Sequence, residues 1–262
     1  MTAAAAPLIF LHLPKTAGTT FDAVLSRQFR PEQIHMLRSE RWLETLAAFP
    51  SLPLAQREAI RLLKGHQPFG LHVHLAPGAR YLTVLRDPVA RVVSHYRYVV
   101  ATRHPRFYPR IEAEGLDLHG YVTRHPSGEL ENGQTRWLSG RLDDAPLDEA
   151  DLARARQHLA EHFAWVGVAE RFDESLVELA LRQGWPRIYY RRRNVGEPQE
   201  QPIAAATRAA ILARNRLDLA LHQEAVAALD AATRRRRWLR AGLVQALRLG
   251  NRLGAALRPL PA

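Results

Sequence analysis

A lysine and three threonines follow a short apolar run near the start of the chain, within Leu8–Phe21. The apolar run predicts a buried strand, and the residues from Thr19 onward have the spacing of a helix. The first N–H groups of a helix are unpaired and carry the positive end of its dipole, so they attract phosphate or sulfate. Lys15 adds a mobile positive charge, and the threonines add hydroxyl donors. The stretch therefore predicts an anion-binding loop.

The order of residues in this loop differs from that of a Walker A loop. That motif, G-x-x-x-x-G-K-[ST], places its lysine after the second glycine and follows it with a ligand for magnesium. Here Lys15 precedes Gly18. An ordinary strand-to-helix turn with one lysine is the alternative interpretation of the same residues.

A second candidate site begins at Arg86, after the β-rich run Tyr81–Leu85. Asp87 suits an N-cap and Pro88 the first helical position, so a helix is expected from there to about residue 100. The guanidinium of Arg86 and the hydroxyl of Ser94 are both good phosphate donors. Ser94 lies about 12 Å along that helix, so the two can share a phosphate only if Arg86 reaches over the helix. A single exposed arginine at a helix start is the alternative.

Together these motifs resemble the sulfotransferase family that includes the heparan sulfate 2-O- and 6-O-sulfotransferases and their bacterial relatives. The letters L-H-L-P-K-T-A-G-T-T-F are similar to the family's 5′-phosphosulfate loop. About seventy residues downstream, L-R-D-P-V-A-R-V-V-S is similar to its 3′-phosphate motif. Weaker similarities, which fade after about Leu229, lie at Lys64–His66, Asn132–Gly140, Val166–Asp173 and Asn215–Asp218.

The resemblance implies 3′-phosphoadenosine 5′-phosphosulfate (PAPS) as donor and adenosine 3′,5′-bisphosphate as product. Arg86 and Ser94 would hold the 3′-phosphate, and Lys15 would also act on the bridging oxygen, so that no metal is required. Arg193, in a loop only loosely similar to the family's cofactor-covering segment, is either a further contact or part of a solvated basic turn. The 5′-phosphosulfate would be cradled by Pro14, Lys15, Thr16, Ala17, Gly18, Thr19 and Thr20.

A base must remove the proton of the acceptor hydroxyl, and histidine is suited to this near neutral pH. His66 follows Gly65 at the end of an expected strand, where the 2-O-sulfotransferases place a G-H base. His72 and His74 are the alternatives, because the 6-O-type enzymes have a segment similar to Gly70–His72. His12 is expected to be structural. Lys64 stands where the 2-O-type enzymes have a second histidine, which leaves the acceptor geometry open.

Strands and helices alternate along the chain, which predicts a parallel sheet covered on both faces. The resemblance implies a three-layer, P-loop-NTPase-like α/β fold with a helical C-terminal extension. We expect a sulfotransferase domain over residues 1–230 and a basic amphipathic tail over residues 231–262. The expected elements are strands at Leu8–His12, Tyr81–Leu85 and Phe163–Val168, and helices at Thr19–Phe29, Leu54–Leu63, Pro88–Val100, Asp148–His162, Glu174–Gln183 and from Thr207 onward.

Composition narrows the class of protein and its partners. The chain has 37 Lys and Arg against 26 Asp and Glu, a net charge of +11, which favours anionic partners. It contains no cysteine, which excludes disulfides and thiolate chemistry. Residues 1–6 have no basic region typical of a signal peptide. We expect a cytoplasmic protein without a nucleic-acid partner.

The tail has leucines at Leu239, Leu243, Leu247, Leu249, Leu253 and Leu257, which a helical wheel places on one broad face. A basic amphipathic helix of this kind lies peripherally on an anionic membrane or packs on its own domain or on a second copy of the chain. Of these, packing or an oligomer contact is the favoured interpretation.

The expected reaction is transfer of a sulfuryl group from PAPS to a hydroxyl of a carbohydrate-like acceptor, by in-line attack with a histidine base. Arginines and aromatic residues between 103 and 141 suit an acidic sugar, and suit a solvated loop almost equally well. A P-loop kinase is a second possibility, weakened by the order of the loop residues. A non-catalytic polyanion-binding protein on the same scaffold is a third.

Overall fold

The computed structural model describes residues 6–37, 41–191, 202–234 and 237–257. At its centre is a five-stranded parallel sheet in the order β2-β3-β1-β4-β5. The carboxyl ends of all these strands therefore meet at one edge, where parallel sheets bind ligands. The strands are β1 (Leu8–Leu11), β2 (Ile34–Leu37), β3 (Leu62–Gly65), β4 (Arg80–Leu85) and β5 (Phe163–Val168).

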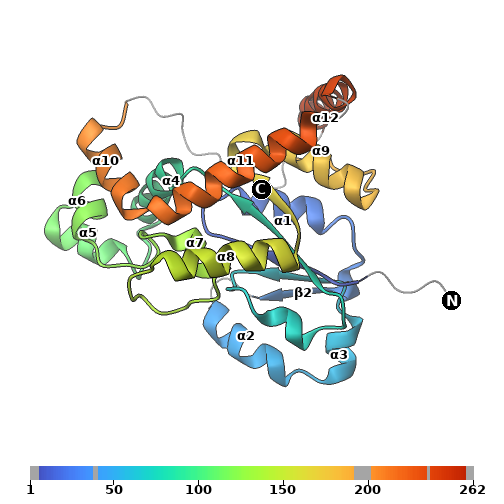
Figure 1. The fold of residues 1–262 in the computed structure, drawn as a ribbon, viewed down its shortest axis with the longest axis horizontal. Helices are drawn as coiled ribbons and strands as arrows, with labels where there is room; N and C mark the ends of the chain where they lie inside the picture. The colour runs from blue at the N-terminus through green and yellow to red at the C-terminus, as the bar shows by residue number, and fades with distance from the viewer. Residues whose placement is uncertain (1–5, 38–40, 192–201, 235–236, 258–262) are drawn as a thin grey trace.

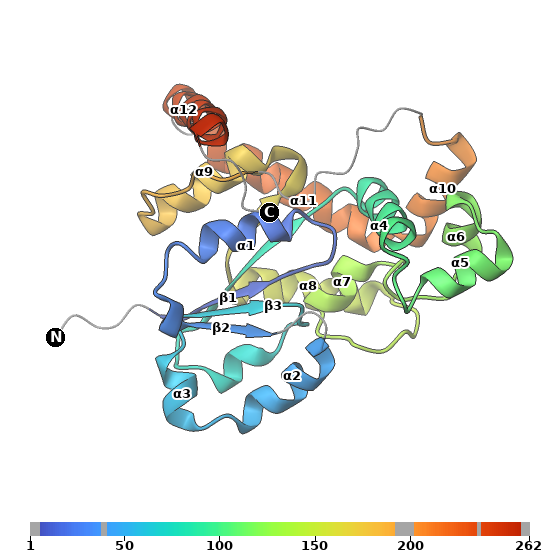
Figure 2. The ribbon, with the colours of Figure 1, turned by 180° about the vertical axis from the view of Figure 1, so that it is seen from behind.

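Successive residues of β1 point to opposite faces of the sheet, as strand geometry requires. Ile9 and Leu11 belong to one core cluster and Leu8 and Phe10 to another. The first cluster is covered by α7 (Gly133–Leu138), α8 (Glu149–His162) and α11 (Arg216–Arg234), which lie in front of the sheet in Figure 1. The second is covered by α1 (Gly18–Leu25), α9 (Phe172–Gln183) and α12 (Arg237–Leu257), and Figure 2 shows α1 from that side. The expected three-layer α/β fold is confirmed.

The remaining helices form two groups outside the layers that cover the sheet. A third core cluster joins α4, α5, α6 and α10 beside the carboxyl edge. Near β2, the short helices α2 and α3 lie below the sheet in the view of Figure 2. The bounds are α2 (Trp42–Ala48), α3 (Leu54–Ala59), α4 (Pro88–Thr102), α5 (Tyr108–Glu114), α6 (Leu118–Arg124) and α10 (Ala205–Arg214).

Most expected elements are present, with corrections at their ends. Asp87 caps α4 by accepting a 2.8 Å hydrogen bond from the Ala90 N–H. The helix expected over Leu54–Leu63 stops at Ala59, because Leu62 and Leu63 pair with β1 as part of β3. The helix expected over Thr19–Phe29 likewise ends at Leu25. The strand β2 and the helix α2 were not expected from the sequence.

The tail helix α12 packs on α9 through Val244 and Leu247, both buried in the second core cluster. Ion pairs support this contact, one of them between Arg248 and Asp173 at 2.8 Å. Leu249 is 58% exposed, so the expectation that it shares the apolar face was wrong: it lies about 200° around the helix from Leu247. The expected boundary at 230/231 falls within α11.

Among the residues that the structure describes, no helix combines the length and apolarity that crossing a bilayer demands. A peripheral membrane contact and an oligomer contact of the tail both stay predictions.

Lys64 has a structural environment on the α1 side of the sheet. Its ammonium group lies 2.9 Å from Asp22 Oδ1 and donates to Ser26 Oγ at 2.7 Å, and its side chain is 7% exposed. His66, two residues later, lies beyond the end of the strand. Lys64 therefore holds α1 against β3.

Replacing Lys64 with Met should destabilise the fold, because it leaves the Asp22 carboxylate without its buried cation. We expect the free energy of unfolding, measured with urea, to fall by about 2–3 kcal/mol. Arg30→Met is the matched control, since the Arg30–Glu32 pair is exposed on both sides. Equal effects of the two substitutions would contradict this role of Lys64.

Candidate active site at the carboxyl edge of the sheet

The loop between β1 and α1 turns tightly through two non-glycine residues in the left-handed region. Lys15 has φ 65° and Ala17 has φ 66°. Thr16 is buried and its hydroxyl donates to the Leu13 carbonyl at 2.9 Å, so this threonine shapes the loop. Non-glycine residues in this conformation are uncommon and cluster at ligand clamps. The backbone thus supports the expectation of an anion-binding loop at Pro14–Thr20.

The loop and the second motif are in direct contact. Arg86 Nη1 donates to the Lys15 carbonyl at 2.9 Å. The Lys15 ammonium lies 4.1 Å from the centroid of the Tyr98 ring, on α4. Ser94 is one turn before Tyr98 and therefore lies on the same face of α4. The structure brings Lys15, Arg86 and the Ser94 face of α4 to one corner of the sheet edge.

This corner is positively charged. Burial and the Arg86 guanidinium lower the pKa of Lys15 to about 8. Burial also lowers the pKa of Arg86, an effect that the Glu170 and Asp87 carboxylates partly offset. The contact between Arg86 Nε and Glu170 is long, at 3.9 Å. An anionic group bound here would relieve the repulsion between the two cations.

Gln134 holds the backbone of Arg86, a role that sequence reasoning missed. Its amide accepts from the Arg86 N–H and donates to the Arg86 carbonyl, each at 2.9 Å. Asp218, from α11, in turn accepts from the N–H groups of Gln134 and Thr135 at 3.0 and 2.7 Å. Both residues lie in the stretches of weaker family similarity, which was the only signal for them.

His66 is held in one tautomer. Its Nδ1 lies 2.8 Å from the His12 carbonyl oxygen, which can only accept, so Nδ1 carries the proton and Nε2 is left as the basic nitrogen. Burial lowers the pKa of His66, although the His12 carbonyl and the Glu129 charge oppose this. His66 is therefore neutral at pH 7 and able to accept a proton.

His12 links the anion loop to His66. Its ring stacks on the His66 ring with centroids 4.4 Å apart, and on the Phe10 ring at 5.0 Å. A Cβ added to Gly18 would lie 1.9 Å from His12 Nε2. Only glycine at the start of α1 leaves room for this ring. His12 lies just beyond β1, and its structural role includes orienting His66.

His72 lies elsewhere. It belongs to the 3₁₀ helix Leu71–His74, and its Nδ1 is 3.2 Å from the hydroxyl of Tyr81, near the amino end of β4. Its ring centroid is 4.6 Å from that of His162. The opposite end of β4 leads to Arg86, so the structure does not bring His72 to the loop of Lys15. Arg193 lies outside the described residues.

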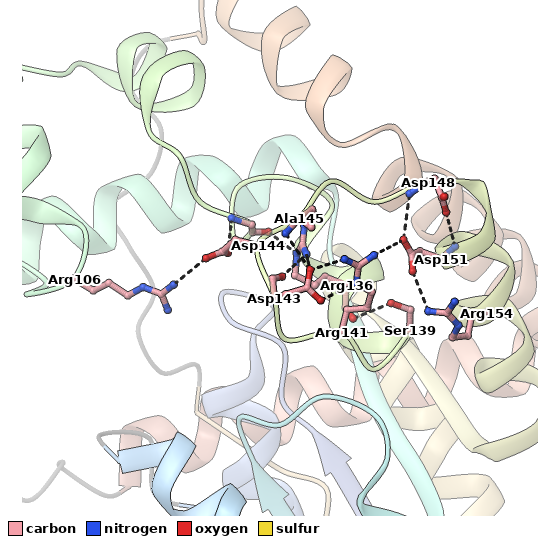
Figure 3. Close-up of polar contacts among 11 residues, drawn as sticks. Arg106, Arg136, Ser139, Arg141, Asp143, Asp144, Ala145, Asp148, Asp151 and Arg154 are labelled. Atoms are coloured by element: carbon pink, nitrogen blue, oxygen red, sulfur yellow. Dashed lines mark hydrogen bonds and ion pairs between the residues drawn. The ribbon is translucent and has the colours of Figure 1, made fainter.

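Several arginines of the segment 103–141 are engaged within the protein. Figure 3 shows Arg136 reaching the backbone of the loop that follows α7, and Arg141 between two carboxylates. Arg136 is 3% exposed and donates to the Ala145 carbonyl at 3.0 Å, and Arg141 lies 3.1 Å from Asp151. These side chains stabilise the loop, so the expectation that they recognise an acidic sugar gains no support.

Comparisons with known proteins show which proteins this chain is similar to. The sequence model of the Sulfotransferase family matches residues 1–179. Galactose-3-O-sulfotransferase 3 of Bos taurus is 29% identical over 233 residues, covering 81% of this chain and 54% of that protein. Its Homo sapiens counterpart is 28% identical over 233 residues, with the same coverage. The chain spans about half the length of the curated relatives it matches.

Among solved structures, a sulfotransferase from Alicyclobacillus acidocaldarius is similar with a TM-score of 0.44 and 17% identity. The similarity covers 84% of this chain and 96% of that chain.

Gly18→Ala should displace His12 and, through the ring stack, His66. The added methyl group overlaps the imidazole, and overpacking of this kind costs about 1–3 kcal/mol. We expect a lower melting temperature and shifted NMR signals of the His66 ring. Gly242→Ala, at a helical glycine with open space around it, is the control: because alanine favours a helix, the melting temperature should not fall, and the His66 signals should stay in place. Unshifted His66 signals in Gly18→Ala would contradict the proposed packing.

Proposed function

Because this chain belongs to the Sulfotransferase family, we propose that it transfers a sulfuryl group from PAPS to a hydroxyl of a saccharide, with His66 as the base. The observation that carries the proposal is the orientation of His66. Its Nδ1–H is bound by the His12 carbonyl, which leaves Nε2 to take a proton beside the loop of Lys15.

The charges of the corner support the choice of donor. PAPS carries a phosphosulfate at one end of its ribose and a phosphate at the 3′ position. Lys15 and the loop Pro14–Thr20 suit the first, and Arg86 with Ser94 suits the second. The Arg86–Lys15 hydrogen bond sets the spacing between the two groups, and Gln134 keeps the Arg86 backbone in place.

In the proposed reaction the acceptor oxygen forms a bond to sulfur as the bond between sulfur and the 5′-phosphate oxygen breaks. His66 Nε2 takes the proton of the acceptor hydroxyl. The Lys15 ammonium stabilises the negative charge that builds on the leaving phosphate oxygen. The His12 carbonyl stabilises the imidazolium that forms, since it continues to accept from Nδ1–H.

The acceptor class rests on the relatives. Both curated relatives are named as galactose-3-O-sulfotransferases, which supports a saccharide acceptor and makes galactose-containing sugars the first to test. Lactose, N-acetyllactosamine and chitobiose, with ³⁵S-labelled PAPS, form a suitable panel.

His66→Ala should reduce sulfate transfer by at least about 10²-fold, the usual contribution of a general base. Its affinity for adenosine 3′,5′-bisphosphate, measured by calorimetry, should stay within about twofold, because His66 is not placed on the nucleotide corner. His72→Ala is the control and should keep transfer near the wild-type rate. Loss of transfer in His72→Ala with retention in His66→Ala would contradict the assignment of the base.

Nucleotide affinity should fall as pH rises from 7 to 9. Lys15, with a pKa of about 8, is mostly charged at the lower pH and mostly neutral at the higher. If the charged form alone binds, the Kd for adenosine 3′,5′-bisphosphate rises about tenfold over this range. Lys15→Met should bind more weakly and show a flat profile. An equally steep profile in that variant would place the titrating group elsewhere.

A further inference from the structure

The proposed nucleotide-binding and catalytic groups follow one another across the sheet edge in strand order. Arg86 follows β4, the loop of Lys15 follows β1, and His66 follows β3. The next strand is β2, at the edge of the sheet. The proposed nucleotide site lies on the β1 and β4 side of His66, so an acceptor approaches His66 from the other side. Because neighbouring strands lie about 4.8 Å apart, the rest of the acceptor then lies near the end of β2.

An aromatic pair occupies that position. Trp42 begins α2, the helix that follows β2 in the chain, and Trp137 lies in the last turn of α7. The Trp137 ring meets the His66 ring edge to face, with centroids 6.0 Å apart and planes at 88°. The Trp42 ring stacks on Trp137 at 5.5 Å and 30°. The described residues thus form a row of rings leading from the base toward β2.

The two tryptophans differ in exposure. Trp137 is buried, with 7% of its surface exposed, and supports the edge of His66. Trp42 is only partly buried against the first core cluster. A partly exposed tryptophan backed by a buried one presents an apolar, rigid surface to a ligand, at a site where polar groups are close by.

We propose that Trp42, supported by Trp137, is the platform on which a pyranose ring of the acceptor lies, an inference that rests on the proposed function. The C–H face of a pyranose is apolar while its rim carries hydroxyls. Packing that face on Trp42 removes apolar surface from water and leaves the rim free to present one hydroxyl to His66. Trp42 is thus assigned to acceptor binding, with no part in the chemical step.

Other aromatic residues of the segment 103–141 are less suited to this role. Tyr121 is fully buried and its hydroxyl is 3.0 Å from His95 Nδ1. Tyr108 is covered by Arg103, 5.7 Å from its ring centroid. Neither of these two contacts involves His66, whereas the Trp137 ring meets the His66 ring edge to face.

The test is Trp42→Ala with lactose as acceptor and galactitol, which has hydroxyls but no ring, as comparison. We expect KM for lactose to rise about five- to tenfold, the loss of roughly 1–1.4 kcal/mol of stacking. The kcat with lactose, the rate with galactitol and the affinity for adenosine 3′,5′-bisphosphate should stay within twofold. Trp42→Phe keeps an aromatic surface and should restore KM to within about twofold of the wild type.

Trp185→Ala is the matched control. Trp185 is also partly buried but packs on Phe29 in the second core cluster, on the other face of the sheet. It should leave KM for lactose unchanged. An unchanged KM in Trp42→Ala, or an equal rise in Trp185→Ala, would overturn the proposal.

Failure of the proposed sulfotransferase function can be distinguished from failure of the Trp42 platform. The wild type can bind adenosine 3′,5′-bisphosphate and yet sulfate neither lactose nor any other acceptor. In that case saturation-transfer NMR of lactose with the nucleotide-bound protein tests, without turnover, whether the sugar binds at Trp42. Saturation transfer from the protein to the ring protons of lactose in the wild type, and its loss in Trp42→Ala, would support the platform. No transfer in the wild type would overturn it.

Discussion

The hydrogen bond from Arg86 to the Lys15 carbonyl is the contact on which the rest of the site depends. It joins two motifs 71 residues apart in the chain and draws two cations toward one corner. Their mutual repulsion is part of the reason that the pKa of Lys15 is low. A corner that holds two positive charges, with the Glu170 carboxylate 3.9 Å from Arg86 Nε, suits a ligand that carries two anionic groups.

Much of the remaining structure keeps this corner in place. Gln134 binds both backbone groups of Arg86, and Asp218 binds the backbone of α7 at Gln134. The side chains of Gln134 and Asp218 are buried, so each would be costly without its partners. On the other face, the pair between Lys64 and Asp22 holds α1 to the sheet and with it the end of the anion loop. The site is supported from both layers of helices.

The histidine pair shows how orientation and proton affinity are set together. The His12 carbonyl fixes the proton on His66 Nδ1, and burial keeps the ring neutral. Gly18 makes the arrangement possible, because any side chain there would overlap His12. One glycine therefore serves both the start of α1 and the position of the base.

The sequence by itself determined the α/β class, the anion loop around Lys15, the capped helix after Arg86 and the resemblance that joins them. Each of these is local, because it follows from the apolar pattern, the cap residues or the short motifs. Only the tertiary structure decided that His66 and not His72 lies beside the loop, and that His12 and Gln134 hold the site. It also decided that Lys64 faces α1 and that Trp42 stacks on Trp137, the ring that meets His66. These relations arise from the strand order and from contacts between residues far apart in the chain, and no local pattern encodes either of them.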